Sequence, residues 1–223
     1  MAPVEIDGNP ITGATIDGTD VQEITVDGDV VFTAGPTVID DFESGNLNNW
    51  NDDGANASIT TNAISGSFSA QLSTSNDAAS LNSFPGDGLP VYPSFGDKIG
   101  IKISDTSSNL FIAASFCVSN YNGSDIRPAT GITRIFLNIN ERDGFLDLNN
   151  SYSADSDQVS LNSKTVYDFT LDIGKSNSNF ITLSEPSHST LSVSATGNES
   201  GGIAFSRGGA SVTQPRYDDV VIF

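Results

Sequence analysis

Cysteine and histidine each occur only once in the 223-residue chain, as Cys117 and His188. A single cysteine excludes an intrachain disulfide, so the fold must be stabilised by packing. Cys117 lies in the apolar run 111–118, where a buried, inert thiol is expected rather than a nucleophile. His188 lies in the polar segment 185–189, which has no nucleophile motif. We therefore interpret it as an exposed loop residue and expect neither a serine-type triad nor a histidine-rich metal centre.

Basic residues are also scarce, because nine Lys and Arg stand against 28 Asp and Glu, giving a formal net charge of −19. The chain has no basic stripe that could neutralise phosphates, so a nucleic-acid partner is not expected. A charge this large repels itself across a folded surface, but at molar salt the Debye length falls to about 3 Å and the repulsion is screened. The composition favours a protein adapted to high salt, and an acidic extracellular protein is the alternative.

Long apolar runs and helix-forming runs are missing as well. No stretch reaches the length of a transmembrane helix, so membrane insertion is not expected. Residues 1–5 lack the basic start and apolar core of a signal peptide, so we expect synthesis in the cytoplasm without ordinary secretion. Apolar residues diluted by Ser, Thr, Asn and Gly are typical of short strands joined by many turns, which predicts an all-β fold.

The first 35 residues contain a repeat. The tripeptides 6–8, 16–18 and 26–28 each place Asp-Gly after a β-branched residue, ten residues apart. Asp-Gly between alternating apolar residues predicts a hairpin with a type I′ turn, most clearly over 24–32. A ribbon this small is not stable alone, so we expect residues 1–35 to form a hairpin arm that docks on a neighbouring subunit or another protein.

Residues 37–223 are predicted to form one antiparallel sandwich, separated from the arm by the Gly35-Pro36 linker. The turn and alternation signals place strands near 37–42, 57–61, 68–73, 98–104, 110–118, 132–140, 144–148, 157–161, 165–173, 179–184, 189–196, 201–206 and 216–222. Paired Asp residues in the opening and closing strands suit a sandwich whose two ends meet.

This module resembles the concanavalin A-like and laminin-G-like jelly rolls found in glycan-binding modules and in virion surface proteins of haloarchaeal tailed viruses. The resemblance is carried, in order, by the segments 39–50 (IDDFESGNLNNW), 66–72 (GSFSAQL), 88–97 (GLPVYPSFGD), 201–205 (GGIAF) and 217–222 (YDDVVI). It implies an antiparallel jelly-roll sandwich whose last strand returns beside the first.

Acidic residues at both ends of the module suggest a structural cation site. Asp40, Asp41, Glu43, Asp218 and Asp219 could converge, and hard carboxylate oxygens suit Ca²⁺. In jelly rolls of this kind a calcium ion commonly lies where the first and last strands meet, which favours Asp41, Glu43 and Asp219 as ligands. A solvated acidic edge of a high-salt surface is the alternative.

Catalytic and binding motifs are few. Retaining glycoside hydrolases on this fold carry Glu-x-Asp-x-x-Glu on one strand, and the nearest match, 141–146, ends in Leu146. We therefore expect no enzymatic activity and interpret Asp143-Gly144 as an ordinary turn. Tyr92 and Tyr121 are candidates for contacts with a glycan, whereas Trp50 is expected in the core.

Together these features favour a non-enzymatic structural protein on the surface of a virion of a haloarchaeal tailed virus, as a tail or baseplate fibre or a head spike. In this interpretation the jelly roll faces outward toward host glycans, and residues 1–35 dock on other virion proteins. A homo-oligomer, trimeric or higher, would provide neighbouring subunits on which residues 1–35 can dock. The alternative is a carbohydrate-binding module of a secreted halophilic protein.

Overall fold

The computed structural model describes residues 5–6, 9–10, 15–16, 19–20, 23–26, 29–33, 35–53, 57–72, 80–83, 86–94, 96–104, 113–120, 134–140, 143–150, 154–173, 180–194, 201–208 and 214–223. Contacts divide the chain into two units, one of residues 1–37 with Phe223 and one of residues 38–222. Across these ranges every regular element is a strand, and no helix has the length and apolarity to cross a membrane.

The first unit contains three two-stranded hairpins. Their strands are β1 (Glu5–Ile6) with β2 (Asn9–Pro10), β3 (Thr15–Ile16) with β4 (Thr19–Asp20), and β5 (Glu23–Val26) with β6 (Asp29–Thr33). The register repeats, because Ile6 lies opposite Asn9, Ile16 opposite Thr19 and Val26 opposite Asp29. Two residues therefore separate the paired strands each time, as the Asp-Gly spacing predicts.

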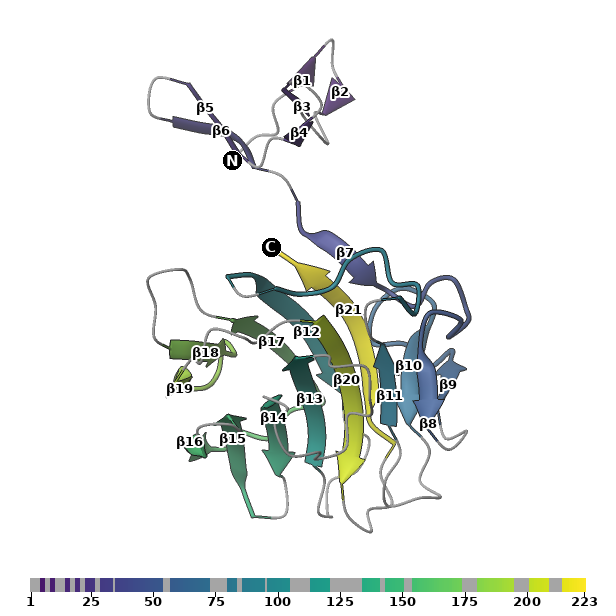
Figure 1. The fold of residues 1–223 in the computed structure, drawn as a ribbon, viewed down its shortest axis with the longest axis vertical. Coiled ribbons are helices and arrows are strands. Elements are labelled where there is room, and N and C mark those ends of the chain that lie inside the picture. The colour runs from purple at the N-terminus through teal and green to yellow at the C-terminus, as the bar shows by residue number, and fades with distance from the viewer. Residues whose placement is uncertain are drawn as a thin grey trace. The chain divides into compact units, whose positions relative to one another are not determined.

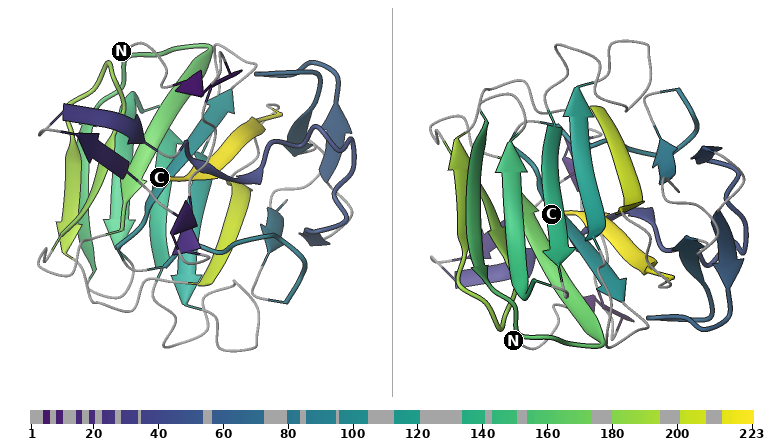
Figure 2. Two further views of the ribbon diagram at one scale, coloured as in Figure 1. Left: turned by 90° about the horizontal axis from the view of Figure 1, so that it is seen from above. Right: turned by 90° about the horizontal axis from the view of Figure 1, so that it is seen from below.

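The second unit is an antiparallel sandwich of two sheets (Figures 1 and 2). The eight-stranded sheet has the order β19-β18-β17-β12-β21-β10-β9, with β7 also paired to β21. Its strands are β7 (Thr37–Asp40), β9 (Ala57–Thr60), β10 (Ser69–Leu72), β12 (Lys98–Ser104), β17 (Val166–Asp172), β18 (Phe180–Ser184), β19 (Leu191–Ser194) and β21 (Arg216–Ile222). The seven-stranded sheet has the order β16-β15-β14-β13-β20-β11-β8. Its strands are β8 (Asn51–Asp53), β11 (Ser80–Ser83), β13 (Ala113–Asn120), β14 (Arg134–Asn140), β15 (Phe145–Asn150), β16 (Asp155–Ser160) and β20 (Gly201–Gly208).

The pairing of β7 with β21 confirms that the opening and closing strands of the sandwich meet. Near this junction Phe42 adopts a φ of +58°, which is rare for a bulky residue, and its side chain is fully buried. Its ring packs against Trp50 and Phe205, with centroids 5.8 and 6.5 Å away. Phe205 in turn stacks on Tyr217 at 4.5 Å, so four aromatic rings join the junction to both sheets.

The core follows from the period-two alternation of apolar residues in each strand. In β12 the buried residues Ile99, Ile101 and Ile103 point inward, and in β15 Leu146 and Leu148 do the same. Trp50 is 7% exposed, which confirms its expected place in the core. Every strand expected within 37–223 is present, and β8 and β11 are additional strands that the sequence analysis missed.

Candidate functional site

The outer surface of the seven-stranded sheet carries polar side chains in register on neighbouring strands. On β15, Phe145, Asp147 and Asn149 are half-buried, and they alternate with the buried Leu146 and Leu148. Phe145, Asp147 and Asn149 therefore face away from the core. The sheet thus has one apolar face that packs inside the sandwich and one face that is partly open to solvent.

Amides and one carboxylate form a row across three strands of this open face. Asn138 of β14 lies opposite Asp147 of β15, which lies opposite Gln158 of β16. Asn138 Nδ2 donates to Asp147 Oδ2 at 3.0 Å, which orients both side chains. We call Asn138, Asp147, Asn149 and Gln158 the amide face. Such a surface offers several hydrogen-bond donors and acceptors with a single negative charge.

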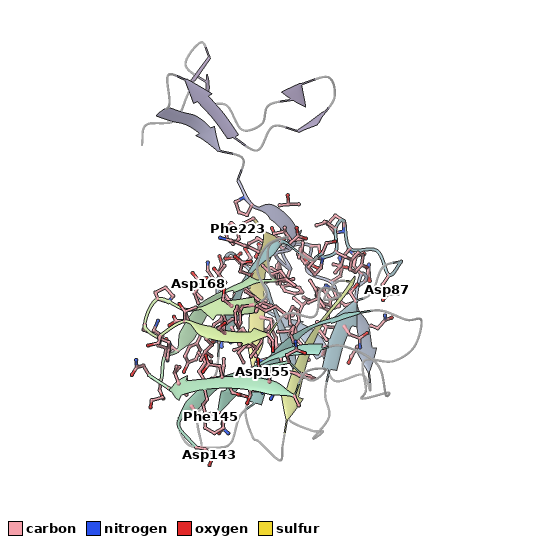
Figure 3. All side chains as sticks on the ribbon, turned by 60° about the vertical axis from the view of Figure 1, so that its left-hand side comes forward. Asp87, Asp143, Phe145, Asp155, Asp168 and Phe223 are labelled. Atoms are coloured by element: carbon pink, nitrogen blue, oxygen red, sulfur yellow. The ribbon has the colours of Figure 1, made fainter. Side chains whose placement is uncertain are left out.

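An open hollow lies at the end of the amide face where β15 begins. It has a volume of about 340 Å³ and is lined by Asp143, Gly144, Phe145, Gln158, Val159 and Ser160. We call it the β15–β16 hollow. Figure 3 labels Asp143 and Phe145, which lie together at one end of the sandwich. The hollow combines a carboxylate, an amide, a hydroxyl and an aromatic ring, a mixture suited to a polar ligand with apolar patches.

The turn that forms one wall of the hollow is fixed by Asn140. Asn140 Nδ2 donates to Asp143 Oδ2 at 3.1 Å, and Asp143 N donates to Asn140 Oδ1 at 3.0 Å. Gly144 has a φ of +74° and donates its N–H to the Asn140 carbonyl at 2.9 Å. These contacts agree with the Asp-Gly turn expected from the sequence.

His188 is not exposed, which corrects the sequence-based interpretation. Its side chain is 1% exposed, and Nδ1 lies 2.7 Å from Glu185 Oε2. The backbone N–H of Asn162 donates to His188 Nε2 at 2.9 Å. Because Nε2 accepts this bond, the ring proton belongs on Nδ1 and is donated to Glu185. No local sequence pattern indicates this contact, because Asn162 belongs to a different loop.

Glu185 is the acceptor at the centre of this buried network. It accepts hydrogen bonds from Lys164 Nζ, from Ser187 N at 2.8 Å and from Ser187 Oγ at 2.6 Å, besides that from His188. Burial by itself would raise the pKa of Glu185, but these hydrogen bonds to the carboxylate outweigh it and lower the pKa to about 2. The network therefore holds a charged carboxylate in the interior with every partner supplied by two loops.

The three expected calcium ligands have other partners. Asp41 Oδ1 accepts the N–H of Glu43, Glu43 Oε1 accepts the N–H groups of Ser67 and Phe68, and Asp219 Oδ2 lies 2.5 Å from Lys102 Nζ. Within the described ranges no three His, Cys, Asp or Glu side chains are grouped so that they could hold a metal ion. Calcium binding by Asp41, Glu43 and Asp219 stays a prediction, which chelation and a melting curve would check.

Asp218 is buried and Asp40 is half-buried next to these residues, and both have structural partners. Burial raises the pKa of Asp40, partly offset by hydrogen bonds from Trp50 Nε1 and the Phe42 N–H, both 2.7 Å long. Burial likewise raises the pKa of Asp218, which accepts from Ser69 Oγ at 2.7 Å and from the Ser65 N–H at 3.0 Å. These carboxylates attach the loops around the β7–β21 junction to the sheet.

Of the two tyrosines expected to contact a glycan, the structure describes Tyr92. Its ring packs against the core, and its hydroxyl lies 3.0 Å from Ser83 Oγ and accepts the Leu89 N–H at 3.3 Å. Tyr121 lies outside the described residues, as does the side chain of Cys117. The role of either tyrosine in glycan binding stays a prediction.

No family model matches the chain, and no curated protein matches its sequence. Solved structures do match its fold. A carbohydrate esterase from the Shiga toxin-encoding bacteriophage phi24B is 12% identical with a TM-score of 0.57, covering 84% of this chain and 98% of that chain. A GH16 protein of Bacteroides ovatus, solved with a mixed-linkage glucan product, is 14% identical with a TM-score of 0.57, covering 82% and 98%. The β-glucanase of Bacillus licheniformis is 11% identical with a TM-score of 0.56, covering 86% and 98%.

These structures correct the expectation that the chain has no enzymatic activity. Most of the matching structures are glycoside hydrolases, among them glucanases and laminarinases that are 8–14% identical to this chain. Likeness at this level of identity shows the fold alone, and the fold is one on which such enzymes are built. The absence of the Glu-x-Asp-x-x-Glu motif therefore does not show that the chain lacks enzymatic activity. The comparison shows that the sandwich is a concanavalin A-like jelly roll.

Proposed function

We propose that the sandwich binds a polysaccharide on the amide face and in the adjoining β15–β16 hollow. The observation that carries the proposal is the register of Asn138, Asp147 and Gln158 on three neighbouring strands, facing away from the core. Amide and carboxylate groups in a row match the regularly spaced hydroxyl groups of a sugar chain. The half-buried rings of Phe136 and Phe145 add apolar surface on the same face.

The matching structures support this proposal by their chemistry. A carbohydrate esterase, a cellulose-induced protein and several glucanases share the fold, and each is named for a carbohydrate or for action on one. The open hollow also gives a long polymer access from the solvent, because its lining residues belong to one turn, the first residue of β15 and the edge strand β16.

Affinity electrophoresis of the full chain in gels that contain laminarin, mixed-linkage β-glucan or soluble cellulose derivatives would test binding. We expect at least one polymer to retard the protein, and we expect Asn138→Ala and Gln158→Ala each to weaken the retardation about five- to tenfold, the value of one lost hydrogen bond. Asp168→Ala is the matched control on the other sheet, where Asp168 is exposed, and it should bind like the wild type. Equal retardation of the wild type and all three variants would refute the proposal. The absence of retardation by every polymer would refute it as well.

Because the fold hosts hydrolases, the same mixtures should be assayed for release of reducing sugar. Hydrolysis would place the reaction on this face only if Asp147→Ala removed it while binding persisted. Release by an Asp147→Ala variant at the wild-type rate would place the reacting groups elsewhere.

We further propose that the chain is a surface protein of a virion, possessing its own attachment unit in residues 1–37. A bacteriophage protein among the matching structures supports this setting, as do the three hairpins, whose described strands pair only within each hairpin and leave their outer edges open. Mass spectrometry of purified particles would detect the chain, and light scattering of the full chain would show a trimer or larger assembly. A monomer that is absent from particles would contradict the proposal.

A further inference from the structure

The wall of the β15–β16 hollow continues into a loop that is held by the chain's only histidine. Ser160 lines the hollow, and the next residue, Leu161, donates its N–H at 2.9 Å to the carbonyl of Gly144, another lining residue. Asn162 then donates its backbone N–H to His188 Nε2 at 2.9 Å and its side-chain Nδ2 to the Ser187 carbonyl at 2.8 Å. Ser160 in the wall of the hollow is thus only two residues before Asn162, which contacts the buried imidazole of His188.

The imidazole can keep this contact only while it is neutral. An imidazolium has a proton on both ring nitrogens, so His188 Nε2 would become a donor facing the Asn162 N–H, which is also a donor. The bond from Nδ1 to Glu185 would survive and would strengthen, because it would then join opposite charges. Protonation therefore costs the loop its contact without expelling the histidine.

The groups around the ring fix which contact gives way. Glu185 holds Nδ1 and is itself held by Lys164 Nζ and by Ser187. Tyr167 of β17 lies with its ring centroid 6.2 Å from that of His188, and its hydroxyl accepts the Lys164 N–H at 3.0 Å. Because the charge of Glu185 holds Nδ1 of the ring, the contact between Nε2 and Asn162 is the one that breaks. The loop that contains Asn162 can then separate from the loop that contains His188.

We propose that His188 is a positioning residue for the β15–β16 hollow, holding its 160–162 wall in place when neutral and releasing it when protonated. The inference rests on the proposed polysaccharide site and adds a dependence on pH to it. With the imidazole neutral the wall is held, and protonation of the imidazole loosens it through Asn162 and Leu161.

The test is an NMR titration of the full chain from about pH 8 to about pH 5, the range over which histidines ordinarily change charge. Since the chain has one histidine, the imidazole signal reports its protonation without overlap. We expect the Asn162 and Leu161 amide signals to follow the same titration. We also expect the protection of the Asn162 amide, measured as its exchange rate relative to the intrinsic rate at each pH, to fall about fivefold, the value of one lost neutral hydrogen bond. The Val193 amide in β19 is the internal control and should not follow.

Two variants separate positioning from simple packing. The amide of His188→Gln reaches toward the Nε2 position, so its oxygen can accept the Asn162 N–H at every pH. The amide of His188→Asn reaches only the Nδ1 position, so it keeps a donor for Glu185 and lacks the second acceptor. Relative to the intrinsic exchange rate at each pH, we expect the Asn162 amide to stay protected throughout in the Gln variant and to stay poorly protected throughout in the Asn variant. Should either variant fail to fold, the wild-type titration alone decides.

Measuring polysaccharide retardation over the same pH range distinguishes the two proposals. Retardation that falls with the imidazole titration in the wild type and stays constant in His188→Gln supports the positioning role. Amide signals that ignore the imidazole titration overturn it, as does retardation that is independent of pH. If no polymer binds at any pH while the Asn162 amide still follows His188, the polysaccharide proposal fails and the control of the wall by His188 stands.

Discussion

A single glycine lets Glu43 fasten a neighbouring loop to the β7–β21 junction. Gly66 has a φ of +57°, and a Cβ added there would lie 2.3 Å from Glu43 Oε1. Replacing it with Ala would strain the backbone by about 1–2 kcal/mol and would also push the Glu43 carboxylate away from the Ser67 and Phe68 N–H groups. We expect Gly66→Ala to lower the urea midpoint of unfolding by more than backbone strain alone would lower it.

Gly45→Ala is the matched control for this prediction. Gly45 has a similar φ of +68°, but an added Cβ would meet only Phe68 side-chain atoms at 3.8 Å, an ordinary contact. Gly45→Ala should therefore show the backbone cost without the displacement of Glu43. Equal losses of stability in the two variants would show that the Glu43 contact contributes nothing.

Glu185 should make the protein sensitive to acid. Its folded pKa of about 2 lies below the ordinary value of 4.5, so the stability that it contributes is complete above pH 4.5 and is lost as the pH falls toward 2. The difference corresponds to about 3 kcal/mol for this buried side chain. The gap in unfolding free energy between the wild type and Glu185→Gln should therefore shrink by about that amount from pH 5 to pH 2. A gap that stays constant over this range would contradict the prediction.

The comparison with Glu185→Gln is necessary because other acids titrate in the same range. Asp40 and Asp218 have raised pKa values, so the folded state binds their protons more tightly and gains stability on acidification. Glu43 and Asp155 have lowered pKa values and act in the opposite direction. These effects are present in both proteins, so the difference between the two titrations isolates Glu185.

The buried position of His188 could not be predicted from its neighbours in the sequence. Segment 185–189 contains Glu, Pro and Ser, which are mostly exposed in proteins, so its polar pattern predicts an exposed loop. Its burial depends on partners in the β16–β17 loop, which only the tertiary fold brings near. By contrast, the core position of Trp50 is predicted correctly, because a large apolar ring that follows the polar loop 43–49 has much to gain from burial.

At the scale of elements, two edge strands from different sheets are joined by carboxylates. Asp157 and Asp155 of β16 accept the backbone N–H groups of Ser192 and Ser194 of β19 at 2.9 and 2.7 Å. Asn150 Nδ2 also donates to the Ser194 carbonyl at 2.6 Å. The outward N–H groups of β19 would otherwise form an open sheet edge, so these side chains close one side of the sandwich.

We expect Asp155→Ala and Asp157→Ala to expose this edge. Hydrogen exchange of the Ser194 amide should become faster in the first variant, and that of the Ser192 amide in the second. The Val193 amide should keep its wild-type rate in both, because residue Val193 alternates with them and lies opposite Ile181 of β18. Exchange rates that change equally at all three positions would indicate fraying of β19 as a whole and not the loss of a particular acceptor.

The element pattern explains which strands could be predicted. Strands such as β15, with alternating Leu146 and Leu148, carry a clear period-two signal, and all strands of that kind were expected. β8 and β11 were missed because they are three and four residues long and are mostly polar, and only Leu81 contributes a fully buried apolar side chain. The amide face was missed for a related reason. Its residues lie on separate strands, and only the pairing register brings Asn138, Asp147 and Gln158 into one row.

At the scale of the whole molecule, repulsion among the acidic residues lowers the stability of the fold, and added salt should weaken this repulsion. The net charge is −19, and within the described residues the ion pairs that salt would weaken are few, with Lys98–Asp172 and Lys102–Asp219 partly exposed. Raising the ionic strength from about 0.1 M to about 1 M shortens the Debye length from roughly 10 Å to roughly 3 Å. Repulsion among 28 acidic residues should therefore fall by more than the attraction of these pairs.

We expect the melting temperature to rise with KCl over this range, and to rise further in molar salt if the surface is adapted to it. Sucrose is the control, because it strengthens burial without screening charge, and its effect should be the same at low and high ionic strength. Replacing two exposed acids distant from the amide face, Asp87 and Asp168, with Asn should raise the melting temperature at low salt and leave it nearly unchanged at high salt. A melting temperature that falls as KCl is added would mean that ion pairing outweighs repulsion, and the prediction of a high-salt surface would then be wrong.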